Sequence, residues 1–141
     1  MIGIVIVAHG GLAREYLAAI EHVVGPQSGI RAITMEEDHD RGDKQDEICA
    51  AAHAVDTGDG VVVVTDLFGS SPSNLSLPAC SHKQRMILYG ANMPMLLKLA
   101  KSRHLPVADA VTLARDAGRK YINCYDLSVD NAPTELRRAA T

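Results

Sequence analysis

Two residues with complementary chemistry, His9 and Asp66, each follow a continuous run of apolar, mostly β-branched residues. A carboxylate that accepts a hydrogen bond from imidazole Nδ1–H fixes the tautomer, leaving Nε2 unprotonated and more nucleophilic. The pair makes up two thirds of a Ser-His-Asp triad, but the sequence has no GxSxG motif to present a nucleophilic serine. We therefore expect the His9 imidazole itself to attack phosphorus and to carry the phosphoryl group as a phosphoramidate.

Small and polar residues that could hold a phosphoryl group come directly after three predicted strands. A glycine beside the histidine permits close backbone approach. A Gly-Ser-Ser stretch precedes a predicted helix, whose first N–H groups and dipole favour a phosphate. Helix capping by the serines and a turn-forming role for the asparagine are alternatives that stay open. The expected phosphoryl-binding residues are Gly10, Gly69, Ser70, Ser71 and Asn92.

The source of the phosphoryl group is indicated by the motifs that the sequence lacks. It has no Walker lysine motif, no GxGxxG and no acidic pair typical of a Mg²⁺ site, so we expect delivery by another protein, with no cofactor and no metal. His39 lies within the charged stretch 36–43, where a metal site is conceivable. Contiguous rather than converging charges favour a solvated acidic loop there.

The elements that must position these residues alternate between strand and helix. Continuous apolar runs predict buried strands, and apolar residues at helical spacing predict helices. Strands are predicted over residues 1–8, 30–35, 61–66, 85–89 and, at the C-terminal end, 121–127. Helices are predicted over residues 12–24, 44–55, 93–103 and 106–118, with a further short helix that begins near residue 72 and ends or bends at Pro78.

This alternation predicts an α/β fold with a single doubly wound, mainly parallel sheet and helices on both faces. Right-handed crossovers give the strand order 2-1-3-4, plus a C-terminal edge strand. His9 and Asp66 then flank the topological switch point, where open α/β sheets bind ligands, on strands about 4.8 Å apart. We expect one domain over residues 1–128 and a flexible tail over residues 129–141.

Composition narrows the class of protein. The chain has 141 residues and a formal net charge of −3, which argues against the basic face of a nucleic-acid binder. With no Trp and one Phe, aromatic platforms for bases are also not expected. The three cysteines are widely spaced and indicate neither a disulfide framework nor a zinc site. Because no apolar run approaches the roughly 20 residues of a membrane span, we expect a cytoplasmic protein without membrane insertion.

Three motifs in order carry a resemblance to a known family. They are Ile-Val-Ala-His9-Gly, Thr-Asp66-Leu-Phe-Gly-Ser-Ser-Pro-Ser-Asn74 and Ala-Asn92-Met-Pro-Met-Leu. Together they resemble the enzyme IIA domain of the mannose (mannose–fructose–sorbose) family of the bacterial phosphoenolpyruvate:sugar phosphotransferase system. The resemblance covers residues 1 to about 127.

The resemblance implies a phosphocarrier rather than a stand-alone turnover enzyme. His9 would accept a phosphoryl group from phospho-HPr on Nε2 and pass it to an enzyme IIB partner, while Asp66 orients His9 and Ser71 binds the phosphoryl oxygens. It also implies a homodimer that exchanges a C-terminal strand, which residues 121–127 could supply. The chain has Gly69-Ser70 where the family often has two glycines, and we expect a stand-alone IIA protein because nothing like a IIB domain follows.

Other interpretations stay open at this point. One is a non-transport regulatory module whose phosphorylation state controls partner binding. Another is the phosphotransfer subunit of dihydroxyacetone kinase, which is disfavoured because that family lacks a stretch like 92–95. A small phosphate-ester hydrolase is a third class, but the sequence offers no separate nucleophile and no metal site.

Overall fold

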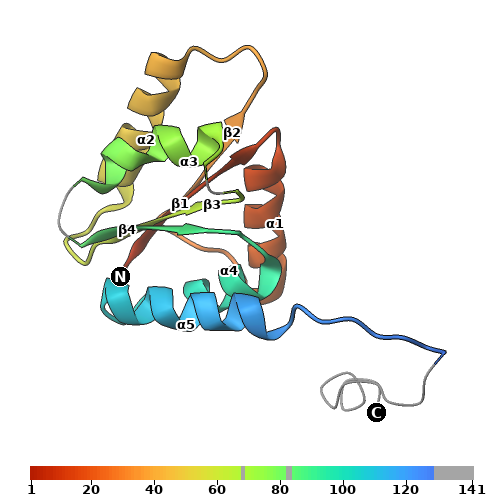
Figure 1. Ribbon diagram of the computed structural model, residues 1–141. Coiled ribbons are helices and arrows are strands. Elements are labelled where there is room, and N and C mark those ends of the chain that lie inside the picture. The colour runs from red at the N-terminus through yellow and green to blue at the C-terminus, as the bar shows by residue number, and fades with distance from the viewer. Residues whose placement is uncertain (68, 82–83, 129–141) are drawn as a thin grey trace.

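The sheet has four parallel strands in the order β2-β1-β3-β4 (Figure 1). The computed structural model describes residues 1–67, 69–81 and 84–128. In chain order the strands are β1 Gly3–His9, β2 Ile30–Met35, β3 Val61–Thr65 and β4 Arg85–Tyr89. The predicted α/β class and the order 2-1-3-4 are confirmed. His9 is the last residue of β1, and Asp66 directly follows β3. Because β1 and β3 are parallel neighbours, both residues lie at the carboxyl ends of the strands.

Helices cover both faces of this sheet (Figure 1). Alternate residues of a strand point to opposite faces, and β1 is buried on both of them. Ile4 and Ile6 belong to one core cluster, whereas Val5 and Val7 belong to the other. The first core lies under α1 Leu12–Val24, α4 Met93–Lys101 and α5 Val107–Lys120, and the second under α2 Arg41–Val55, α3 Ser71–Ser76 and the short 3-10 helix η1 Leu77–Cys80.

The start of α2 differs from the expected one. The helix begins at Arg41, three residues before the predicted start, because Asp40 caps it. The Asp40 carboxylate accepts a hydrogen bond of 2.9 Å from the backbone N–H of Asp43. A side-chain acceptor at this place satisfies one of the free donors in the first turn. Charged residues that read as loop in the sequence are therefore the first turn of the helix.

The prediction of a C-terminal edge strand is wrong for the single chain. Residues 121–127 follow α5 without pairing with any strand of the described part, and they lead away from the sheet (Figure 1). Ile122 and Leu127 are 74% and 83% exposed. An extended segment becomes a strand only where a neighbouring strand accepts and donates its backbone hydrogen bonds. The tail predicted over residues 129–141 lies outside the described residues.

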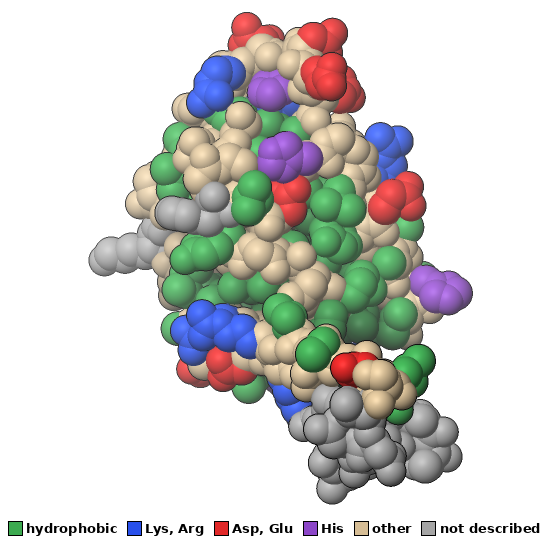
Figure 2. All heavy atoms as spheres, turned by 45° about the vertical axis from the view of Figure 1, so that its right-hand side comes forward, with side chains coloured by type: hydrophobic (Ala, Val, Ile, Leu, Met, Phe, Trp, Pro, Cys, Tyr) green, Lys and Arg blue, Asp and Glu red, His purple; other side chains and the backbone are tan. Residues whose placement is uncertain are grey.

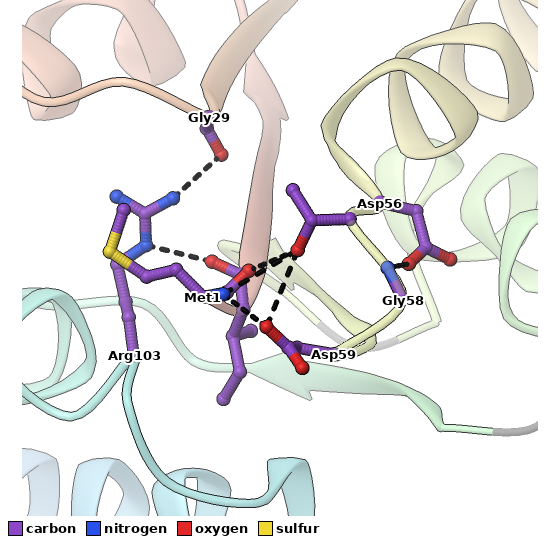
Figure 3. Close-up of polar contacts among 8 residues, drawn as sticks. Met1, Gly29, Asp56, Gly58, Asp59 and Arg103 are labelled. Atoms are coloured by element: carbon purple, nitrogen blue, oxygen red, sulfur yellow. Dashed lines mark hydrogen bonds and ion pairs between the residues drawn. The ribbon is translucent and has the colours of Figure 1, made fainter.

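Polar contacts hold the amino-terminal end of β1, which is the end of the strand away from His9 (Figure 3). Buried Arg103 donates from Nε to the carbonyl of Ile2 at 2.7 Å and from a terminal nitrogen to the carbonyl of Gly29 at 3.2 Å. Burial lowers the pKa of Arg103 from its ordinary value. The amino group of Met1 pairs with the carboxylate of Asp59. These contacts hold β1 in place at its start, so that its end presents His9 in a defined position.

Candidate functional site

His9 and Asp66 form a hydrogen-bonded pair at the carboxyl ends of β1 and β3. Nδ1 of His9 lies 2.8 Å from Oδ2 of Asp66, and the backbone N–H of His9 donates to the same oxygen at 3.1 Å. An ionised carboxylate only accepts hydrogen bonds, so Nδ1 carries the proton and neutral His9 has its lone pair on Nε2. The His9 side chain is 55% exposed and that of Asp66 is 14% exposed. The geometry thus holds one nitrogen of the ring and leaves the other free to react.

The Asp66 carboxylate is partly buried, and its charge acts on a neighbouring tyrosine. Its second oxygen, Oδ1, is buried and has no hydrogen-bond partner among the described residues. Burial raises the pKa of the nearby Tyr16 phenol, and the charge of Asp66 raises it further. That protonated hydroxyl donates to the carbonyl of Ala91 at 3.2 Å. This contact ties α1 to the loop after β4.

A cavity of about 610 Å³ opens beside His9. It is lined by the ends of β1 and β2, the loop after β2 and the start of α3. Gly10 has a φ of +55°, which glycine adopts readily. Its backbone forms an isolated bridge with Met35 at the end of β2, and this bridge holds the Gly10 backbone beside the cavity. The lining residues are His9, Gly10, Met35, Glu36, Glu37, His39, Ser71 and Pro72.

The three residues of the Gly-Ser-Ser stretch differ in what they contact. Ser71 lines the cavity together with His9. The N–H of Gly69, in contrast, donates to Oγ of Ser73 at 2.8 Å, and the hydroxyl of Ser70 donates to the carbonyl of Leu67 at 2.5 Å. Gly69 and Ser70 therefore use these groups within the turn that leads into α3.

The structure places Asn92 away from the cavity of His9. Its side-chain oxygen accepts from the N–H of Met95 at 3.0 Å, and its amide nitrogen donates to the carbonyl of Gly118 at 3.1 Å. It lines a separate cavity of about 420 Å³ between β4 and α5. These contacts make Asn92 the N-cap of α4 and a link to α5, a structural role closer to the turn-forming alternative than to phosphoryl binding.

Sequence reasoning left the loop after β2 out of the site. Glu36, Glu37 and His39 line the cavity of His9, although the run 36–43 reads as a solvated acidic loop. The signal was the strand order, since β2 pairs with β1 and its following loop therefore emerges beside His9. Figure 2 shows the resulting surface, with two histidine side chains near one another and acidic side chains above them.

A second cavity, of about 630 Å³, lies at the opposite, amino edge of the sheet. Three of its ionisable groups already have partners: Arg85 pairs with Asp56, Asp59 pairs with the amino group of Met1, and Arg103 donates to backbone carbonyls. The cavity of His9 holds an exposed imidazole that is hydrogen-bonded to Asp66, so the side chains rather than the volume make it the candidate site. No described helix has the length and apolar content of a membrane span. Within the described ranges, no three His, Cys, Asp or Glu side chains gather in a metal-binding group.

Comparison with known proteins assigns the chain to a class. The model of a family described as "PTS system fructose IIA component" matches residues 3–114. This match covers most of the 141 residues and includes both His9 and Asp66. The chain belongs to this family of IIA components of the sugar phosphotransferase system, and the resemblance noted in the sequence is confirmed.

Individual relatives agree with the family. The mannose-specific EIIAB component of Escherichia coli K12 is 28% identical over 122 residues, which are 84% of this chain and 38% of that protein. The crystal structure of the phosphotransferase system component EIIA from Streptococcus agalactiae superposes with a TM-score of 0.76 at 28% identity, covering 91% of this chain and 98% of that one. The mannose/sorbose-specific IIA subunit from Enterococcus faecalis, at 24% identity, has a TM-score of 0.75, covers 89% of this chain and 96% of that one, and supports the fold.

Proposed function

We propose that the chain is a cytoplasmic phosphocarrier in which His9 accepts a phosphoryl group on Nε2 and hands it to a partner protein. The observation that carries this proposal is the pair at the carboxyl edge of the sheet. Asp66 holds Nδ1 at 2.8 Å while the His9 side chain remains 55% exposed. Ser71 and the backbone of Gly10 line the cavity into which a phosphoryl group would project.

The partners follow from the family. We propose phospho-HPr as the donor and an enzyme IIB protein as the acceptor, because this chain belongs to the IIA components. The Escherichia coli relative is named an EIIAB component, and this chain spans 38% of it. A surface that serves two protein partners in turn must leave the reactive nitrogen accessible, and His9 meets that requirement.

The transfer itself is an in-line displacement at phosphorus. The lone pair on Nε2 of His9 forms a new P–N bond while the bond between phosphorus and the donor nitrogen breaks, and that nitrogen keeps the electron pair. The positive charge that develops on the ring is balanced by the Asp66 carboxylate through Nδ1–H. The reverse geometry serves the second transfer, in which the nitrogen of the acceptor attacks and Nε2 is the leaving group.

We further propose a homodimer in which residues 121–127 of one copy add to the sheet of the other. The outer edge of β4 pairs with no strand within the described chain. Residues 121–127 carry exposed apolar side chains, among them Ile122, Tyr125 and Leu127. In a dimer, residues 121–127 of one copy would pair with the outer edge of β4 in the other copy and bury their apolar side chains there.

The test of the proposed function is phosphoryl transfer from labelled phosphoenolpyruvate in the presence of enzyme I and HPr. The wild-type chain should acquire an acid-labile label on His9, and His9→Ala should acquire none. His22→Ala is the matched control, because His22 is an exposed histidine on α1 that does not line the cavity. An unlabelled wild-type chain, or a fully labelled His9→Ala variant, would exclude this function.

A further inference from the structure

The cavity of His9 has an unusual charge for a site that receives a phosphoryl group. Glu36 and Glu37 line it, and Asp66 lies behind His9. Its lining in the described part of the chain includes no lysine and no arginine. A phosphoryl group would add about two negative charges to this acidic environment. Some positive group or set of N–H donors must therefore offset that charge.

His39 is the lining residue, other than His9, that can become positively charged. It is half-buried, whereas Glu36, Glu37, Asp38 and Asp40 around it are exposed. Its Nδ1 lies 2.5 Å from the carbonyl oxygen of Glu36. A carbonyl oxygen only accepts hydrogen bonds, so Nδ1–H of His39 is the donor. The contact fixes the tautomer and leaves Nε2 of His39 as the nitrogen that binds a proton from solvent.

We propose that His39 binds the transferred group: as an imidazolium, it donates from Nε2–H to an oxygen of the phosphoryl group on His9. This inference rests on the proposed function of His9. His39 forms no covalent bond and takes up one proton from solvent when the phosphoryl group arrives. Donation from a charged imidazolium to a phosphoryl oxygen is a charge-assisted hydrogen bond, stronger than a bond between neutral groups.

The charged neighbours of His39 in the chain are of both signs. They are the carboxylates of Glu36, Glu37 and Asp38 in the loop and of Asp40 before α2, and the side chains of Arg41 and Lys44 in the first turn of α2. The phosphoryl group on His9 would add negative charge from the end of β1. Protonation of His39 and phosphorylation of His9 are therefore coupled, since each event makes the other more favourable.

The first experiment measures how a phosphoryl group distributes between HPr and this chain at pH 6.5. His39→Gln should shift the equilibrium toward phospho-HPr by about tenfold, which is the loss expected for one charge-assisted hydrogen bond. His39→Lys keeps a positive charge and should restore most of that loss. His22→Gln, an exposed histidine outside the cavity, should behave like the wild type.

The second experiment follows His39 by NMR in the free and the phosphorylated chain. Phosphorylation of His9 should move the midpoint of the His39 titration upward by about one pH unit, as expected for a dianion several ångströms away in a solvated cavity. The resonance of His22 should not move. A merely structural histidine would show no such shift.

The outcomes separate this inference from the function on which it rests. Absence of label on His9 in the wild-type chain would remove both. Normal labelling of His9, with His39→Gln indistinguishable from the wild type and no shift of the His39 titration, would overturn the role of His39 alone. Label found on His39 in the His9→Ala variant would also overturn it, because His39 would then be an acceptor.

Discussion

The imidazole of His9 is held on one side and open on the other. Asp66 accepts from both Nδ1–H and the backbone N–H of the same residue, so a single carboxylate oxygen sets the ring and its attachment point together. Such double anchoring reduces the rotamer freedom that the side chain would lose in the transition state. These contacts suit Asp66 to the role proposed for it, which is to position the reacting nitrogen and to balance the charge on the ring.

Replacing Asp66 by Asn should slow phosphoryl acceptance by His9 about 10- to 100-fold. The amide keeps the shape of the side chain but loses the negative charge that favours Nδ1–H. The initial rate of labelling from phospho-HPr measures this effect. Asp116→Asn, at an exposed position on α5, is the control and should keep the wild-type rate. Equal rates for the wild type and Asp66→Asn would contradict the positioning role.

Cys80 should resist alkylation far more than Cys124. The pKa of Cys80 is raised to about 11, chiefly by burial, while Arg85 lowers it and Cys49 raises it by smaller amounts. At pH 8 only about one Cys80 thiol in a thousand is then a thiolate, the reactive form. Cys124 is exposed. Mass spectrometry after brief iodoacetamide treatment should find Cys124 modified and Cys80 unmodified, with both modified in denaturant. Rapid modification of native Cys80 would refute this.

At the scale of elements, the contacts of Arg85 hold the edge strand β4 against its neighbouring helices. The guanidinium of Arg85, on β4, donates to the Asp56 carboxylate at the end of α2 at 3.0 Å and to the carbonyl of Ala79 at 3.0 Å. It therefore joins three elements around one buried charge. Breaking such a buried pair by removing one partner is more costly than losing a surface pair.

Asp56→Asn should make the unfolding free energy less dependent on acid. The N–H of Gly58 and then the side chain of Arg85 lower the pKa of Asp56 from its ordinary value. A lowered folded-state pKa stabilises the native chain above about pH 4 and stops doing so as pH falls through the folded value. Urea titrations should show the wild type more stable than Asp56→Asn at pH 7, with the difference shrinking toward pH 3. A difference that grows in acid would contradict this assignment.

Asn92→Ala distinguishes capping from phosphoryl binding. Loss of the N-cap of α4 should lower the free energy of unfolding by about 1 kcal/mol. The rate of phosphoryl acceptance at His9 should stay within about twofold of the wild type, because Asn92 lines a different cavity. Urea unfolding and the labelling assay measure the two quantities. A large loss of acceptance with unchanged stability would restore the binding role predicted from the sequence.

At the scale of the whole molecule, the described residues after α5 pair with no described strand. They lead away from the sheet, and the outer edge of β4 also has no described strand beside it (Figure 1). Exposed apolar residues lie on both, including Met86 and Tyr89 on β4. The proposed dimer interface would bury these exposed apolar side chains.

Sedimentation should show a dimer for the wild-type chain at micromolar concentration. The double variant Ile122→Asp/Leu127→Asp should shift it to monomer, because burying two carboxylates in an apolar interface is unfavourable. Val23→Asp, at an exposed apolar site on α1, should leave the dimer intact. A wild-type chain that sediments as a monomer at 100 μM, well above the concentration of the assay, would refute the proposed assembly.

The sequence predicted the sheet because its strands are continuous apolar runs, and the same pattern placed His9 beside Asp66. It could not show that Asn92 caps α4, since a cap and a ligand use the same side-chain atoms. It also left His39 in a solvated loop, because charge composition alone does not tell which side of a loop faces a neighbouring strand. The side chains of residues 121–127 predict a strand, yet pairing depends on a neighbouring strand, and the described part of the chain places none beside this segment.

The exposure of His9 would also limit the lifetime of a phosphoryl group on it. A phosphoramidate stored at an open surface is reachable by water as well as by protein partners, so a phosphoryl group on His9 would run down at a rate set by hydrolysis. With its ring 55% exposed, His9 would lose the proposed phosphoryl group to water over time. The group would be conserved only while an acceptor arrives sooner than water reacts, and the abundance of that acceptor would decide how much of the incoming phosphate is delivered.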